Sequence, residues 1–199
     1  MKTINVSGGG DCPELALNGI RIALEFALPN SLAYVFSDAT AKDYGFYEDV
    51  SKLIQKKQVS VNFLLTGDCN AQSSYGYQVY HKLSRISNGQ VYDMSKNDVK
   101  DVLMAIKQSV SHNYAALKSL DVSSSGTSQT DLNVDKSISE ISVRLSGRNP
   151  TLSIRDPSNE TISGGDELSL QNLKLINIKD PKGGIWTIEA GAESAHSLR

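Results

Sequence analysis

Two aspartates occupy positions where an α/β protein places a ligand site. Asp11 ends the run Gly8-Gly9-Gly10-Asp11 ahead of a predicted helix, and Asp38 directly follows the apolar run Leu32 to Phe36. In open parallel sheets, residues at the carboxyl ends of strands lie together at one edge. Carboxylates and neighbouring hydroxyls are the hard oxygen ligands that Mg²⁺ and Ca²⁺ take. The sequence therefore predicts a cation site carried by Asp38 and Asp11.

Two other interpretations account for the same residues. Asp is a frequent N-cap, so Asp11 can cap a helix while Asp38 merely ends a strand. The glycine loop Gly8 to Gly10 suggests a phosphate- or nucleotide-binding α/β enzyme, because free backbone N–H groups before a helix favour anions. Its spacing is neither a Walker loop nor the dinucleotide fingerprint, and Asp11 places a carboxylate where a phosphate would sit. We therefore keep the enzyme as the alternative to a cation-binding module.

The two cysteines have similar settings. Cys12 lies in Gly-Asp-Cys-Pro and Cys69 in Gly-Asp-Cys-Asn, and each follows a predicted strand. A parallel sheet would bring the two loops together at one edge, where a disulfide can form in an oxidising compartment. Two unrelated buried thiols are the other interpretation, and the residues alone leave both open.

The elements that position these residues alternate between helical and strand patterns over residues 1–120. Pro13 is suited to open a helix, because its fixed φ matches the first turn. Further helices are predicted at 47–57, 75–86 and 95–117, and strands at 32–36, 59–65 and 90–92. The continuous apolar run of the first strand predicts burial on both faces. This alternation predicts an α/β layer built on a mainly parallel sheet with helices on both faces.

The rest of the chain changes its period. Residues 121–136 are rich in serine and are interpreted as a linker. From residue 137 to 199 apolar residues alternate with polar ones, and turn-forming tracts separate them, which predicts a small β-sandwich. Trp186 lies in one of these strand patterns and is expected in the core.

Bulk properties exclude some classes of partner. The 199 residues carry a formal net charge of −2, so nothing in the charge balance favours nucleic acid. The longest apolar runs fall far short of the roughly 20 residues of a membrane span. The three histidines are scattered, and neither a Ser-His-Asp nor a Cys-His arrangement is evident. We therefore expect a module that is not an enzyme.

Several motifs resemble one family. The runs Gly8 to Glu14, Ala33 to Ala39 and Leu64 to Cys69 resemble the von Willebrand factor A (VWA) domain of hemicentins. The tail, with Val143 to Gly147 and Gly184 to Thr187, resembles the galactose-binding-like β-domain that follows it. The resemblance covers nearly the whole chain. It implies a truncated VWA domain over 1–120 and, over 137–199, a galactose-binding-like sandwich incomplete at its C-terminus.

The resemblance also implies a metal-ion-dependent adhesion site. Three loops supply such a site: an Asp-x-Ser-x-Ser loop, a loop that carries Thr, and an Asp after a central strand. Asp38 matches the last, whereas Asp11 lies where the Thr would be, and no Asp-x-Ser-x-Ser precedes Gly8. We therefore expect a fragment of a longer secreted protein, with its strand Leu32 to Phe36 left at a sheet edge. Mg²⁺ or Ca²⁺ binding is expected to be weak or absent in this fragment.

The function expected from the resemblance is that of an extracellular module that binds matrix or cell-surface proteins. In that setting the sequons at Asn159 and Asn5 are candidate glycosylation sites, and Cys12 and Cys69 a candidate disulfide. An intracellular VWA scaffold with reduced cysteines is a further alternative.

Overall fold

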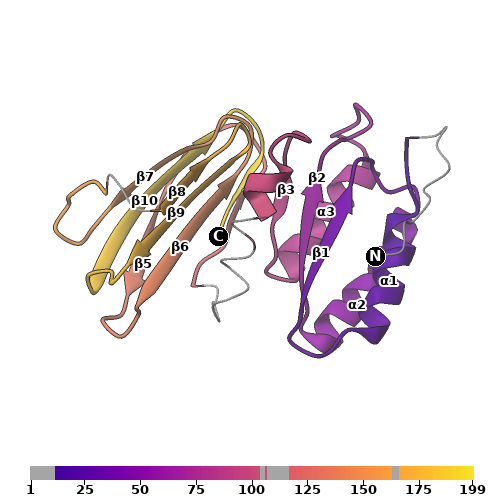
Figure 1. Cartoon of the computed structure of the whole chain (residues 1–199), viewed down its shortest axis with the longest axis horizontal. Coiled ribbons are helices and arrows are strands. Elements are labelled where there is room, and N and C mark those ends of the chain that lie inside the picture. The colour runs from indigo at the N-terminus through magenta and orange to yellow at the C-terminus, as the bar shows by residue number, and fades with distance from the viewer. Residues whose placement is uncertain (1–11, 104–105, 107–116, 163–165) are drawn as a thin grey trace.

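The computed structural model describes residues 12–103, 106, 117–162 and 166–199. Helices and parallel strands form the first part of the chain, and antiparallel strands form the second part beside it (Figure 1). Residues 99–103 and 106 are also helical. In chain order the elements of the first part are α1 (Ala16–Phe26), β1 (Leu32–Ser37), a 3₁₀ turn (Tyr44–Phe46), α2 (Tyr47–Lys57), β2 (Ser60–Leu65), α3 (Tyr75–Ile86) and β3 (Val91–Asp93).

The three strands of the first part form a parallel sheet in the order β1-β2-β3. Its central strand β2 places Phe63 opposite Val35 on one side and Val91 on the other. Phe63 and its alternate neighbours Val61 and Leu65 face the helices α1, α2 and α3, and all three are buried in the larger core of this part. A strand buried on both faces is mostly apolar, and the one buried polar side chain of β2, Asn62, accepts a hydrogen bond from the backbone N–H of Gln90 at 3.0 Å.

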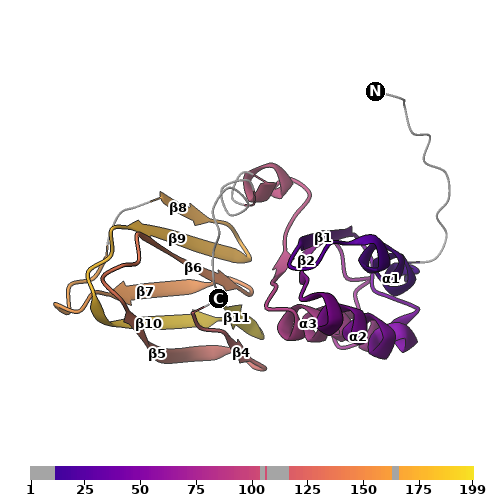
Figure 2. The ribbon, with the colours of Figure 1, turned by 90° about the horizontal axis from the view of Figure 1, so that it is seen from below.

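The opposite face of the parallel sheet is covered by other elements. Leu64 and Tyr92 pack there against Val102, in the helical segment 99–103, and against Leu173 of the second part. Figure 2 shows α2 and α3 below the sheet and the helical segment above it. The expected α/β layer with helices on both faces is therefore confirmed. Most of the long helix predicted over 95–117 lies outside the described residues, and Leu117 is not helical.

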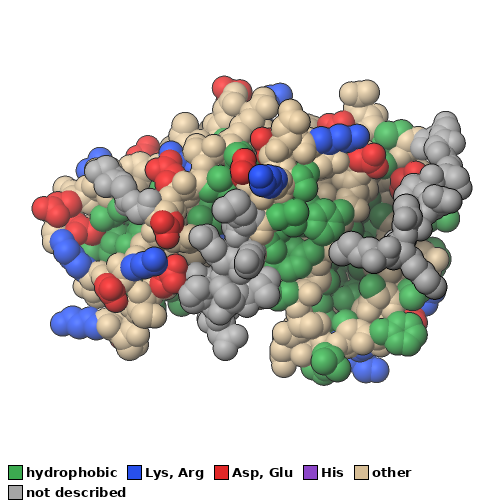
Figure 3. Space-filling model, viewed as in Figure 1, with side chains coloured by type: hydrophobic (Ala, Val, Ile, Leu, Met, Phe, Trp, Pro, Cys, Tyr) green, Lys and Arg blue, Asp and Glu red, His purple; other side chains and the backbone are tan. Residues whose placement is uncertain are grey.

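Two expectations for the first part are wrong. The first helix begins at Ala16 and not at Pro13, because Glu14 is held in extended backbone by a bridge to Ala41. Strand β1 is not covered on both faces in the described part of the chain: its ends Leu32 and Phe36 are 49% and 57% exposed. Among the described strands, β1 pairs with β2 alone and so lies at the edge. Hydrophobic side chains gather over this part of the molecule in Figure 3.

The second part is a sandwich of two antiparallel sheets. One sheet has the order β5-β10-β7 and the other β4-β11-β6-β9-β8. Trp186 lies in the core between them, 2% exposed, as expected. The strands are β4 (Leu120–Val122), β5 (Gly126–Val134), β6 (Glu140–Ser146), β7 (Thr151–Arg155), β8 (Asp166–Ser169), β9 (Leu173–Lys179), β10 (Gly184–Ala192) and β11 (His196–Leu198).

The segment 121–136 is not the linker that its serine content predicted. It holds most of β4 and all of β5, and β5 pairs with β10 over nine residues. Only Leu132 and Val134 of β5 are buried. The serine-rich composition misled the prediction because β5 is an edge strand, held in place by backbone hydrogen bonds to β10. Most of its side chains lie outside the core and so need not be apolar.

The two parts share an interface. Leu173 of β9 belongs to the same buried cluster as Leu64 and Tyr92 of the parallel sheet. In β4, the carboxylate of Asp121 accepts hydrogen bonds from Arg85 of α3 at 3.0 Å and from Arg199 of the second part at 2.9 Å. An apolar contact and the ion pair between Arg85 and Asp121 therefore join the sandwich to the α/β layer.

Candidate functional site

The carboxyl ends of the parallel strands bring three aspartates to one edge of the sheet. Asp38 follows β1, Asp68 follows β2, and Asp93 ends β3. The loops after β1 and β2 lie in close contact, since a Cβ on Gly67 would lie 2.2 Å from the carbonyl oxygen of Asp38. Glycine at position 67 therefore permits the loops after β1 and β2 to approach.

Asp38 is the predicted ligand that the structure leaves available. Its side chain is exposed and makes no hydrogen bond or ion pair within the described residues. The hydroxyls beside it are already used: Ser37 donates to the carbonyl oxygen of Ala39 at 2.9 Å, and buried Thr40 donates to the sulfur of Cys69 at 3.5 Å. Among the predicted oxygen ligands of this loop, the Asp38 carboxylate is therefore the one that makes no hydrogen bond within the described residues.

A disulfide closes the same edge. The structure joins Cys12 to Cys69, with 5.6 Å between their Cα atoms and a sequence separation of 57. The Cys69 sulfur also accepts a hydrogen bond from the backbone N–H of Thr40 at 3.4 Å. The bridge therefore fixes three segments together: the one before α1, the loop after β1 and the loop after β2.

Behind the edge lies a half-buried acid, Asp93, that sequence reasoning missed. The Tyr77 hydroxyl of α3 donates a hydrogen bond to Asp93. Burial raises the pKa of Asp93, and the nearby charge of Asp68 raises it further. Burial also raises the pKa of Tyr77, so the hydroxyl stays protonated and continues to donate. The sequence did offer a signal for this residue, because Asp93 ends a short strand much as Asp38 follows one.

A helix cap was also missed. Asp43 accepts hydrogen bonds from the backbone N–H groups of Leu17 and Asn18 at 3.0 and 2.8 Å. Asp43 lies 25 residues or more away in sequence and so satisfies the first turn of α1 from outside the helix. Local spacing gave no signal for this cap, because only the fold brings the two segments together.

The described residues do not by themselves make a metal site. They contain no group of three or more His, Cys, Asp or Glu side chains placed to hold an ion. Asp11, the other predicted ligand, lies outside the described residues, as do the loop Gly8 to Gly10 and the sequon at Asn5. Asn159 is described, and it lies in an exposed turn of the sandwich rather than at this edge.

Comparison with protein families matches both parts of the chain in order. Residues 1–96 match the model of a von Willebrand factor A domain. Residues 116–199 match the model described as hemicentin galactose-binding domain-like. The chain is therefore of the class in which a VWA domain is followed by a galactose-binding-like β-domain.

Individual relatives match the whole of the chain. Hemicentin-1 from Mus musculus and from Homo sapiens are each 38% identical over 204 residues, covering 100% of this chain and 4% of the relative. The human von Willebrand factor A domain-containing protein 7 is 26% identical, covering 100% of the chain and 24% of that protein. Over its whole length, the chain is therefore similar to the hemicentins, and its two modules stand in the order that the two family models give. It spans only a small fraction of the length of these relatives.

One solved structure, a Bacillus licheniformis lipase in its propeptide form, aligns with 78% of this chain and 42% of its own at 15% identity. Its TM-score of 0.33 is too low to carry an argument about fold or activity. Among the described helices, none is long and apolar enough to cross a membrane.

Proposed function

We propose that this chain is a binding module of an extracellular matrix or cell-surface protein, and that it acts by adhesion without catalytic turnover. The observation that carries the proposal is the similarity to hemicentin-1 over the whole of this chain, with both modules present in order. The disulfide between Cys12 and Cys69 supports an oxidising compartment. The partners would be matrix or cell-surface proteins that contact the edge where Asp38 is exposed.

Asp38 is the residue through which the edge would act. An exposed carboxylate with no internal partner is available to a cation or to a basic group on a partner protein. Since Ser37 and Thr40 are committed to internal hydrogen bonds, Asp38 alone cannot hold an ion tightly. We expect Mg²⁺ or Ca²⁺ to bind to this chain with a Kd of about 0.1 mM or higher, or not at all.

An adhesion assay tests the proposal. The full chain, immobilised on a surface, should retain cells or matrix protein above an albumin-coated control. Asp38→Ala should reduce retention, whereas Asp166→Ala, which removes an exposed carboxylate from β8 of the sandwich, should not. Equal retention by the chain and by albumin would contradict the adhesion proposal.

Calorimetry separates the proposal from the enzyme alternative. Titration with Mg²⁺ or Ca²⁺ should show at most the weak affinity of extracellular sites, with Kd of about 0.1 mM or higher. ATP and NAD should release no binding heat. Tight nucleotide binding would favour the alternative built on Gly8 to Gly10.

A thiol count tests the compartment. The native protein purified without reductant should show no reactive thiol, since Cys12 and Cys69 are bridged. Two reactive thiols per chain would favour the intracellular scaffold instead.

A further inference from the structure

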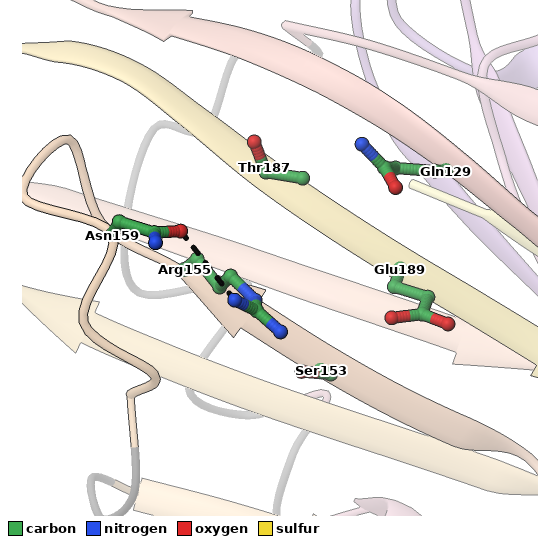
Figure 4. Close-up of a pocket in the computed structure, with 6 residues that line it drawn as sticks. All are labelled: Gln129, Ser153, Arg155, Asn159, Thr187 and Glu189. Carbon is green, nitrogen blue, oxygen red and sulfur yellow. Dashed lines mark hydrogen bonds between the residues drawn. The ribbon is translucent and has the colours of Figure 1, made fainter.

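The outer face of one sheet of the sandwich forms a polar groove. Its lining comes from all three strands of that sheet and from the turn after β7, and it encloses about 330 Å³ (Figure 4). Glu189 of β10 lies in register between Gln129 of β5 and Ser153 of β7. The remaining lining residues are Arg155, Asn159 and Thr187.

The side chains of this groove have unused hydrogen-bonding capacity. Gln129, Ser153 and Glu189 form no side-chain hydrogen bond or ion pair within the described residues. Arg155 makes one long hydrogen bond, 3.4 Å, to the Oδ1 atom of Asn159. The groove therefore offers a carboxylate, an amide, a hydroxyl and most of a guanidinium to a polar occupant.

The turn at one end of the groove carries the sequon Asn159-Glu160-Thr161. Asn159 has a φ of 62°, a conformation that Asn tolerates, and its N–H donates to the carbonyl oxygen of Asp156 at 2.9 Å. The Asp156 carboxylate accepts from the N–H groups of Ser158 and Glu160, which fixes the turn. Asn159 and Thr161 are both exposed, so a modifying enzyme can reach them.

The orientation of Asn159 links the sequon to the groove. Its Oδ1 atom faces Arg155 from within the lining, while its Nδ2 atom makes no hydrogen bond within the described residues (Figure 4). Nδ2 is the atom to which an N-linked sugar is joined. A sugar on that atom would start at the mouth of a groove that is lined with donors and acceptors.

We propose that an N-linked glycan on Asn159 lies in this groove and covers the outer face of β5, β10 and β7. The inference rests on the proposed extracellular function, because the modification requires passage through the secretory pathway. In the transfer, a bond forms between Nδ2 and C1 of the first sugar. The bond from C1 to the oxygen of a lipid-linked pyrophosphate donor breaks, the pyrophosphate leaves with the electron pair, and the amide loses one proton.

An attached glycan suits this groove better than a free ligand. The groove has no aromatic side chain to stack on a sugar, so a saccharide in solution would have only polar contacts that water also satisfies. Tethering at Asn159 removes most of the entropic cost of association, and weak contacts then suffice. The hydroxyl and acetamide groups of the first sugars match Glu189, Gln129 and the guanidinium of Arg155.

The experiment uses the full chain, secreted from animal cells that keep glycans in the high-mannose form, in an Asn5→Gln background. Peptide mass mapping should show a glycan on Asn159 that Thr161→Ala removes and Thr161→Ser retains. An endoglycosidase that cuts between the first two sugars should act about fivefold more slowly on the native protein than on a denatured sample. That factor corresponds to about one net hydrogen bond holding the glycan in place.

A groove variant supplies the decisive comparison. Gln129→Ala combined with Glu189→Ala should bring the native cleavage rate up to that of the denatured sample. Asn133→Ala, an exposed β5 residue outside the groove lining, should leave cleavage slow.

Two results would overturn the inference: an unmodified Asn159 in secreted protein, or native cleavage as fast as in the denatured sample. Either can occur while the adhesion assay with Asp38→Ala succeeds, so failure of this inference is distinguishable from failure of the proposed function. A glycan that is present and protected in a chain that retains no cells would contradict only the adhesion proposal.

Discussion

The disulfide between Cys12 and Cys69 should carry a large share of the stability of the first part. It closes a loop with a sequence separation of 57 residues. In the chain-entropy description, cross-linking a loop of that length lowers the entropy of the unfolded chain enough to stabilise the fold by about 4 kcal/mol. This exceeds the contribution of any one hydrogen bond at the edge, which is about 1 kcal/mol.

The perturbation is the double substitution Cys12→Ser and Cys69→Ser, compared with the native protein in urea. With a slope of about 2 kcal/mol per molar urea, the unfolding midpoint should fall by about 2 M. Wild-type protein held in reductant should unfold at the same midpoint as the double variant, because both lack the cross-link.

Two signals separate the parts of the molecule in this assay. The described helices all lie in the first part, so far-ultraviolet circular dichroism at helical wavelengths reports on it. Trp186 is the one tryptophan of the sequence and lies in the core of the sandwich, so its fluorescence reports on the second part. The helical signal should show the full shift. The reasoning is refuted if the helical midpoint of the double variant falls by less than about 0.5 M, equivalent to about 1 kcal/mol.

Three further predictions concern packing, pH and the interface. Gly67→Ala should destabilise the protein by about 1–3 kcal/mol in urea unfolding, because its Cβ has no room, whereas Gly19→Ala in the exposed middle of α1 should be neutral or stabilising. Burial lowers the pKa of His81 to about 4, so the unfolded chain binds a proton below pH 6.5 that the folded chain does not, and stability should fall between pH 6.5 and 4. The stability loss is at most about 3 kcal/mol, and it is smaller where water still solvates the ring. The His81→Gln variant should not show this fall in stability, and a variant that loses as much stability as the native protein over the same pH range would contradict the prediction. Asp121→Asn should lower stability by about 1–2 kcal/mol, because it breaks the ion pairs with Arg85 and Arg199. When Arg199→Ala is added, the stability loss of the double variant should be smaller than the sum of the two single losses, since both changes break the same pair. Strictly additive losses would contradict the coupling.

Sequence periodicity predicted the first part well because its elements bury regular apolar faces. Helix α2 spans 47–57 and helix α3 spans 75–86, as expected, and β2 begins one residue after the predicted start. The start of α1 was misplaced because a long-range bridge from Glu14 to Ala41 overrides the local preference of Pro13. Local propensity decides a helix end only where no tertiary contact competes for the backbone.

The candidate site was only partly predictable. The position of Asp38 after a strand and the matching Gly-Asp-Cys settings pointed to one edge, and the structure places Asp38 and the disulfide there. That the hydroxyls of Ser37 and Thr40 are turned inward could not be read from the sequence. A hydroxyl hydrogen-bonds to whichever acceptor the fold supplies, so its availability is a property of the three-dimensional arrangement.

What the sequence by itself determined is the type and order of the modules, whereas it left the pairing of Cys12 with Cys69 open. Periods of 3.6 and 2 residues reflect burial within single elements, and family motifs are local runs of residues. Only the tertiary structure decided that the serine-rich segment becomes β5, that Asp43 caps α1, and that Asn159 lies at the mouth of a groove. Each of these depends on pairing between residues far apart in the chain, and such pairing leaves no periodic signal in either partner.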